Sequence, residues 1–114
     1  MRRGEVWLIC LDPTVGAEIK KTRPAVIVND DSIGVLPLKV IVPITEWKDR
    51  YSIAPWMVKI QPDPENGLDK PSAADAFQMR SVAQQRFIRR VGRLSDALME
   101  ELAKALAIVL GIRM

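Results

Sequence analysis

The chain has 114 residues, of which 48% are hydrophobic and 27% charged, and its formal net charge is +3. A chain of this length has room for one hydrophobic core, so we expect a single domain over residues 1–114 of the soluble globular class rather than a disordered or membrane protein. It contains no apolar run of about 18 residues and no apolar stretch after Met1-Arg2-Arg3, so we expect a cytoplasmic protein that does not enter a membrane.

Short apolar runs predict four strands in the first 60 residues, at 4–10, 25–29, 38–45 and 54–60. The turn signal Asp12-Pro13 ends the first strand, and Pro24 suits the start of the second because it has no ladder donor to offer. Pro43 lies within the third run and predicts an edge strand or a bulge there.

A turn region at 61–67, rich in proline and ending in Asn66-Gly67, separates these strands from two more. The alternating segment 72–82 predicts a fifth strand, and 88–91 predicts a short sixth. Closely spaced short strands favour a small barrel or sandwich.

The last segment changes to helical spacing, with apolar residues at Leu98, Leu102, Leu106, Val109 and Leu110. Ser95 is the expected N-cap, Asp96 favours the first turn, and Gly111 ends the helix. We expect one face to pack on the barrel, with Glu100, Glu101 and Lys104 in water. A partner-binding stripe is the alternative.

Positive charge is concentrated in two segments. Five arginines and no carboxylate lie between Gln78 and Leu94, and Lys20, Lys21 and Arg23 precede the second strand. These segments indicate a polyanionic partner, with solvated strand edges as the alternative interpretation.

The sequence contains no histidine. This excludes Ser-His-Asp hydrolysis, the two-histidine scheme of many ribonucleases and a zinc site built on imidazole. The single Cys10 is expected to pack as an apolar residue in a strand. Asp30 and Asp31 would point apart in an extended chain, and we expect no metal and no cofactor.

Four segments together form a recognisable pattern: 1–7 (MRRGEVW), 12–18 (DPTVGAE), 20–28 (KKTRPAVIV) and 78–81 (QMRS). With this pattern the chain resembles toxins of the MazF/PemK family, the endoribonuclease half of a toxin–antitoxin pair. The resemblance covers nearly the whole chain. It implies a mainly β fold with a C-terminal α-helix, a small SH3-like barrel of the MazF/PemK/CcdB type.

The resemblance implies a catalytic pair of Arg23 and Thr45, assisted by Glu18. Arginine suits the stabilisation of a phosphorane, because its planar fork of donors binds phosphate bidentately and stays charged. From the sequence alone, without the resemblance, a surface cation paired with Glu18 is the better interpretation of Arg23. The family has a small hydroxyl residue before this acid, where the chain has Ala17, and a polar residue after it, where the chain has Ile19.

The expected RNA-binding residues are the cations, aromatic and polar groups around this pair: Lys20, Lys21, Trp47, Gln78, Arg80 and Ser81. Gln78 suits a base edge and Arg80 a phosphate, and Trp47 offers a face for stacking. For residues 78, 80 and 81, the polar face of an alternating strand is an equal alternative. Trp7 is expected in the core.

The resemblance further implies a homodimeric, metal-independent, sequence-specific endoribonuclease that cuts single-stranded RNA to 2′,3′-cyclic phosphate and 5′-hydroxyl ends. It implies a MazE-like antitoxin whose acidic C-terminal segment occupies the RNA groove. Two alternatives remain open. One is a gyrase-inhibiting toxin of the CcdB type, and the other is a non-catalytic RNA-binding barrel.

Overall fold

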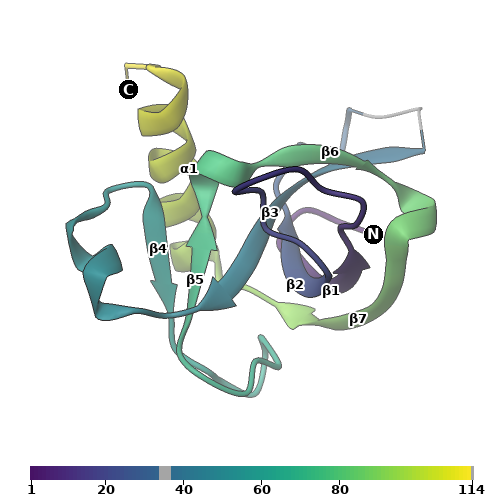
Figure 1. Ribbon diagram of the computed structural model, residues 1–114, viewed down its shortest axis with the longest axis horizontal. Coiled ribbons are helices and arrows are strands. Elements are labelled where there is room, and N and C mark those ends of the chain that lie inside the picture. Colours follow the sequence, from purple (N-terminus) through teal and green to yellow (C-terminus); the bar gives the residue numbers. More distant parts are fainter. Residues whose placement is uncertain (34–36, 114) are drawn as a thin grey trace.

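The computed structural model describes residues 1–33 and 37–113. The chain folds into a seven-stranded sheet with one α-helix at its C-terminal end (Figure 1). This confirms the expected mainly β fold with a C-terminal helix. The elements are β1 (Glu5–Cys10), β2 (Thr22–Ile27), β3 (Leu38–Glu46), η1 (Asp49–Ile53), β4 (Met57–Ile60), β5 (Ser72–Asp75), η2 (Ala76–Gln78), β6 (Arg80–Ala83), η3 (Gln84–Arg86), β7 (Phe87–Arg93) and α1 (Asp96–Leu110).

The sheet runs in the order β4-β5-β3-β2-β1-β7, and β6 also pairs with β3. The pairs are antiparallel. Strands β4 and β7 end this order, so in the described part of the chain the sheet curves in the manner of a barrel without closing on itself.

Strand β3 changes its partner halfway along. Residues 38–41 pair with β6, residues 44–46 pair with β5, and β2 lies along the other side of β3. Pro43 pairs with Ala25 of β2 on one side, and on the other side it falls in the gap between the β6 and β5 pairings, where a missing N–H breaks no ladder. The prediction that Pro43 marks an edge strand or a bulge is therefore wrong, because β3 is a central strand that switches neighbours.

The expected strand over 72–82 is also wrong in one respect, because η2 divides it into β5 and β6. The Asp75 carboxylate accepts a hydrogen bond from the Phe77 N–H at 3.1 Å and so caps this short turn. Alternation of polar and apolar residues cannot reveal such a cap. Two other strand boundaries differ from the prediction: β2 begins earlier than expected, at Thr22, and β4 begins later than expected, at Met57.

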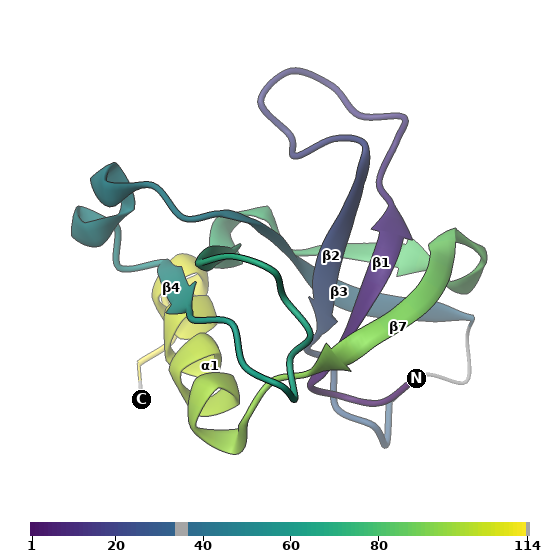
Figure 2. The same cartoon turned by 90° about the horizontal axis from the view of Figure 1, so that it is seen from below.

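The sheet buries a different apolar core on each face. The larger core lies between the sheet and α1 and includes Val26, Val42, Ile60 and Leu102. The second core is enclosed by the curved part of the sheet and consists of Ile9, Leu11, Ala25, Ile27, Ile41 and Val82. Trp7, expected in the core, is only partly buried and packs against this second core. Figure 2 shows that the β1–β2 loop projects at the top of the view, whereas α1 lies at the lower left.

The helix follows its sequence signals at both ends. The Ser95 hydroxyl accepts a hydrogen bond from the Leu98 N–H at 3.2 Å, and Gly111 adopts a left-handed φ of 69° that ends α1. Leu110 was expected on the packed face but is 53% exposed. The deeply buried positions are Met99, Leu102, Ala105 and Ala107.

Candidate active site

Side chains from residues 78–86 hold the loop between β1 and β2, residues 11–21, by hydrogen bonds. The Gln78 carboxamide accepts a hydrogen bond from the Ile19 N–H at 2.5 Å and donates one to the Ala17 carbonyl at 3.2 Å. It therefore holds the backbone on both sides of Glu18. Gln78 was predicted to read a base edge, but here its amide is engaged by the loop.

Two arginines fasten the beginning of the same loop. Arg80 Nη1 donates to the Leu11 carbonyl at 3.2 Å, and Arg86 Nη1 donates to the carbonyls of Cys10, at 3.2 Å, and Asp12. Arg86 was not among the predicted site residues, because no local pattern relates it to a loop 74 positions away. The hydrogen bond to Leu11 thus restrains the guanidinium of Arg80, a residue that also lines a cavity beside the loop.

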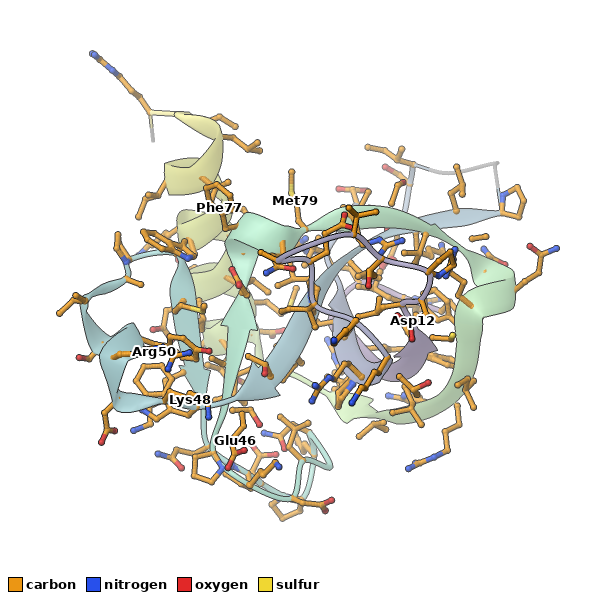
Figure 3. All side chains as sticks on the ribbon, viewed as in Figure 1. Asp12, Glu46, Lys48, Arg50, Phe77 and Met79 are labelled. Atoms are coloured by element: carbon orange, nitrogen blue, oxygen red, sulfur yellow. The ribbon has the colours of Figure 1, made fainter. Side chains whose placement is uncertain are left out.

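A cavity of about 350 Å³ opens between this loop, β3 and the η2–β6 segment. Its lining combines an apolar wall with an acid, an amide and a cation: Ala17, Glu18, Ile19, Pro43, Phe77, Gln78, Met79 and Arg80. Phe77 and Met79 follow one another along one edge of the molecule in Figure 3. Phe77 is 68% exposed, so its ring offers a free face for a planar apolar ligand.

Arg23 and Thr45 are brought to the same face of the sheet beside this cavity. The last pair between β2 and β3 is Ala25 with Pro43, and each strand continues two residues further, to Arg23 and to Thr45. Since side chains two apart on a strand share a face, both residues lie on the face of Pro43, about 7 Å along their strands. Pro43 itself lines the cavity. Arg23 and Thr45 do not themselves line the cavity, and the strand register puts both on the face of Pro43, which does.

The loop presents three further predicted residues. Glu18 is exposed, lines the cavity and accepts a hydrogen bond from the Val15 N–H at 2.6 Å. In the described residues it forms no ion pair with Arg23, whose Nε donates to the Lys20 carbonyl at 3.3 Å. Lys20 and Lys21 are both exposed.

Lys21 adopts a backbone φ of 71°. This left-handed conformation costs a residue with a side chain about 1 kcal/mol relative to glycine. Its carbonyl accepts from the Leu11 N–H at 2.9 Å, which closes the base of the loop. A lysine at a position suited to glycine indicates that its side chain serves a purpose other than stability.

The last two predicted residues lie apart from the cavity. Ser81 pairs with Val40, whereas its neighbour Arg80 pairs with Ile41, so alternation turns Ser81 to the opposite face. Trp47 lies just beyond β3, two residues after Thr45, where its ring contacts Tyr51 and Lys59. Lys59, in β4, was not predicted, because only strand pairing brings it near Thr45.

Asp75, which caps η2 below the cavity wall, is 6% exposed. Burial raises the pKa of its carboxyl above the ordinary value, and hydrogen bonds from the backbone N–H groups of Phe77 and Gln78 oppose part of this rise. This titratable group therefore supports the segment that carries Phe77 and Gln78.

Within residues 1–33 and 37–113, no three or more histidine, cysteine or acidic residues lie close enough together to hold a metal ion. The helix present in the described part of the chain is neither long nor apolar enough to cross a bilayer.

Comparison with known proteins identifies the family. Residues 2–110 match the model of the PemK-like, MazF-like toxin of type II toxin–antitoxin systems. The curated protein Endoribonuclease MazF9 of Mycobacterium tuberculosis is 34% identical, with 98% of each chain covered. Endoribonuclease MazF of Staphylococcus saprophyticus is 33% identical, with 98% of this chain and 92% of that protein covered.

Solved structures share the fold at lower identity. A mycobacterial endoribonuclease in complex with its cognate antitoxin superposes with a TM-score of 0.78 at 20% identity, covering 100% of this chain and 98% of that one. MazF of Deinococcus radiodurans gives a TM-score of 0.79 at 21% identity, with 97% and 96% covered. The match over nearly the whole length, with relatives above 30% identity, shows that this chain belongs to the PemK-like, MazF-like family of type II toxins.

Proposed function

We propose that the chain, acting as one domain, is a metal-independent, sequence-specific endoribonuclease that cuts single-stranded RNA. Two full-length curated relatives are named endoribonucleases, which supports the activity. The observation that supports the proposal is the strand register, because Arg23 and Thr45 share the face of Pro43, which lines a cavity together with Glu18 and Arg80.

The proposed reaction uses the 2′-hydroxyl of the substrate as nucleophile. Its oxygen attacks the adjacent phosphorus, the bond from phosphorus to the 5′-oxygen breaks, and the products carry a 2′,3′-cyclic phosphate and a 5′-hydroxyl. The 2′-hydroxyl must lose a proton and the departing 5′-oxygen must gain one. Glu18, whose carboxylate is exposed at the cavity, is proposed to accept the first proton.

Arg23 is proposed to bind the nonbridging oxygens as the phosphorane gains charge. Its guanidinium needs no protonation step, and a donor held in place before the reaction stabilises developing charge without reorganisation. Thr45 is proposed to add a hydroxyl hydrogen bond from the neighbouring strand. The pair thus performs the charge stabilisation that histidine or a metal performs in other ribonucleases.

The surroundings suit single-stranded RNA. Exposed Lys20 and Lys21 on the loop, and Arg80 at the cavity, are proposed to bind phosphates. The apolar cavity beside Phe77 and Met79 can hold an unstacked base, which duplex RNA does not offer. Sequence specificity would arise from this cavity.

We also propose that this toxin works as a cytoplasmic homodimer and is inhibited by an antitoxin of the MazE type. One solved relative is an endoribonuclease in complex with its cognate antitoxin, and others are MazE-MazF of Deinococcus radiodurans. An acidic, disordered antitoxin segment would be attracted by the cationic groups that bind RNA and would compete with it.

The test is to incubate the purified protein with a long single-stranded RNA in EDTA, beside Arg23→Ala and Thr45→Ala, and to identify the new termini. Discrete cuts ending in cyclic phosphate, lost in both variants, are the expected result. Cutting that requires a divalent ion, or that persists in Arg23→Ala at the parental rate, would contradict the mechanism. An absence of cutting would favour a binding-only barrel or a gyrase poison.

A further inference from the structure

Thr45 and Lys59 belong to one row of side chains across three strands. In the register of the sheet, Ala73 of β5 pairs with Thr45 of β3 on one side and with Lys59 of β4 on the other. Directly paired residues in antiparallel strands point to the same face. Lys59 is therefore two strand spacings, or about 10 Å, from Thr45 on that face.

The burial of β4 confirms which face this is. Val58 and Ile60, the two neighbours of Lys59, are 4% and 0% exposed and belong to the core beneath α1. Lys59 is exposed and points away from α1. The β1–β2 loop, which carries Glu18, projects at the top of Figure 2, whereas α1 lies at the lower left.

The ammonium group of Lys59 is held by aromatic contacts on this surface. Lys59 Nζ lies 4.9 Å from the centre of the Trp47 ring, and the Trp47 and Tyr51 rings meet edge to face at 5.8 Å. Arg50 Cζ lies 5.3 Å from the Tyr51 ring, so a second cation ends the cluster. The backbone N–H of Trp47 donates to the Pro71 carbonyl at 3.0 Å, which fixes the segment.

The cluster carries an uncompensated positive charge. Among the described residues, no carboxylate lies within 4 Å of Lys59 Nζ. A cation–π contact restrains an ammonium group without neutralising it. Figure 3 shows Lys48 and Arg50 on the segment between β3 and β4, with Glu46 beside them at the end of β3, where it pairs with Lys70 at 3.6 Å.

We propose that Lys59 binds a phosphate of the RNA strand that flanks the cut, on the side of Thr45 away from Arg23. This inference rests on the proposed endoribonuclease function and adds a substrate contact to it. A strand whose scissile phosphate lies between Arg23 and Thr45 and which continues across β5 crosses the side chains that cover Ala73, which is 0% exposed. The next charged group it meets is Lys59, restrained by Trp47.

The first test compares Lys59→Met with Lys104→Met in cleavage assays at several salt concentrations. Methionine keeps the apolar stem and removes the charge, and exposed Lys104 on α1 is the matched control. We expect Lys59→Met to lower kcat/KM about three- to tenfold at low salt and to reduce the log–log salt slope by about 0.7, as for one lost phosphate contact on a single strand. Lys104→Met should match the parent, and neither change should alter the unfolding temperature.

The second test locates the contact. Oligonucleotides that span the mapped cut carry one uncharged methylphosphonate linkage at successive flanking positions. One linkage should slow cleavage by the parent but leave Lys59→Met unaffected, since the contact is already lost. Equal sensitivity of the two proteins at every linkage, or a salt slope like that of Lys104→Met, would overturn the proposal. If the parent cuts no RNA, the proposed function fails instead.

Discussion

Gln78 holds the residues on either side of Glu18: its carboxamide accepts a hydrogen bond from the Ile19 N–H at 2.5 Å and donates one to the Ala17 carbonyl at 3.2 Å. The carboxamide thus restrains the backbone on both sides of the proposed proton acceptor. Its proposed role is to position Glu18, since the loop engages its oxygen and one of its two N–H donors.

Gln78→Ala should loosen the loop. Loss of two hydrogen bonds, worth about 2 kcal/mol together, should speed hydrogen exchange at the Ile19 amide about 30-fold and lower cleavage, without changing the sequence at the cut. Gln78→Glu can still accept from Ile19 but cannot donate to Ala17, so its effect should be smaller. Exposed Gln85→Ala is the control. Unchanged exchange at Ile19 with an altered cleavage sequence would restore the base-reading role.

Arg23→Ala should lower kcat for RNA cleavage by about 10²- to 10³-fold, because it removes a donor aimed at the charge that develops on the phosphorane. Stability should change little, since this side chain donates an exposed hydrogen bond to the Lys20 carbonyl. Arg23→Lys should recover only part of the rate, as it keeps the charge and loses the bidentate fork. Exposed Arg113→Ala serves as the control. Equal rates for the alanine variant and the parent would remove Arg23 from the mechanism.

Lys21→Gly should separate stability from binding. Glycine relieves the left-handed conformation at φ 71° but adds freedom to the unfolded chain, so the free energy of unfolding should stay within about 1 kcal/mol of the parent. RNA affinity should fall, and its salt slope should shrink by about 0.7. A fall in stability with unchanged RNA affinity would mean that the lysine side chain has a structural role.

Asp75→Asn should stabilise the protein at neutral pH. Because burial raises the pKa of Asp75 in the folded state, the parent is most stable below the unfolded value of 3.8 and loses that stability as pH rises through the raised folded pKa. Asparagine carries no charge and can still accept from Phe77. Urea unfolding should therefore show a more stable variant at pH 7 and no difference at about pH 3.5. A variant less stable than the parent at pH 7 would contradict this account.

The sequence predicted correctly those helix and strand ends that are determined by residues close by in the chain. Ser95 caps α1 and Gly111 ends it, as expected, and the third strand begins at Leu38. The division of 72–82 escaped prediction, because it depends on a single hydrogen bond from Phe77 to Asp75. The prediction for Pro43 was wrong because a proline is tolerated in this central strand only where β3 changes its partner from β6 to β5.

The site was predictable only in part for a similar reason. The family pattern named Arg23, Thr45 and Glu18, and strand register then placed the first two on one face. No local periodicity links Gln78 to Ile19, 59 positions away, or Arg86 to Asp12. Lys59 likewise depends on two strand pairings that meet at Ala73. The roles of Gln78, Arg86 and Lys59 depend on contacts between segments that are distant in the sequence. The pattern within each segment does not predict those contacts.

The central claim is that the RNA supplies its own nucleophile while Arg23 and Thr45 stabilise the phosphorane. The most direct measurement uses an oligonucleotide with one 2′-deoxy nucleotide immediately 5′ to the scissile phosphate. We expect binding to be retained and cleavage at that linkage to be abolished, whereas a 2′-deoxy nucleotide one position away should be tolerated. Cleavage at the substituted linkage at the normal rate would contradict the mechanism, because the attacking oxygen would then have to come from water or from the protein.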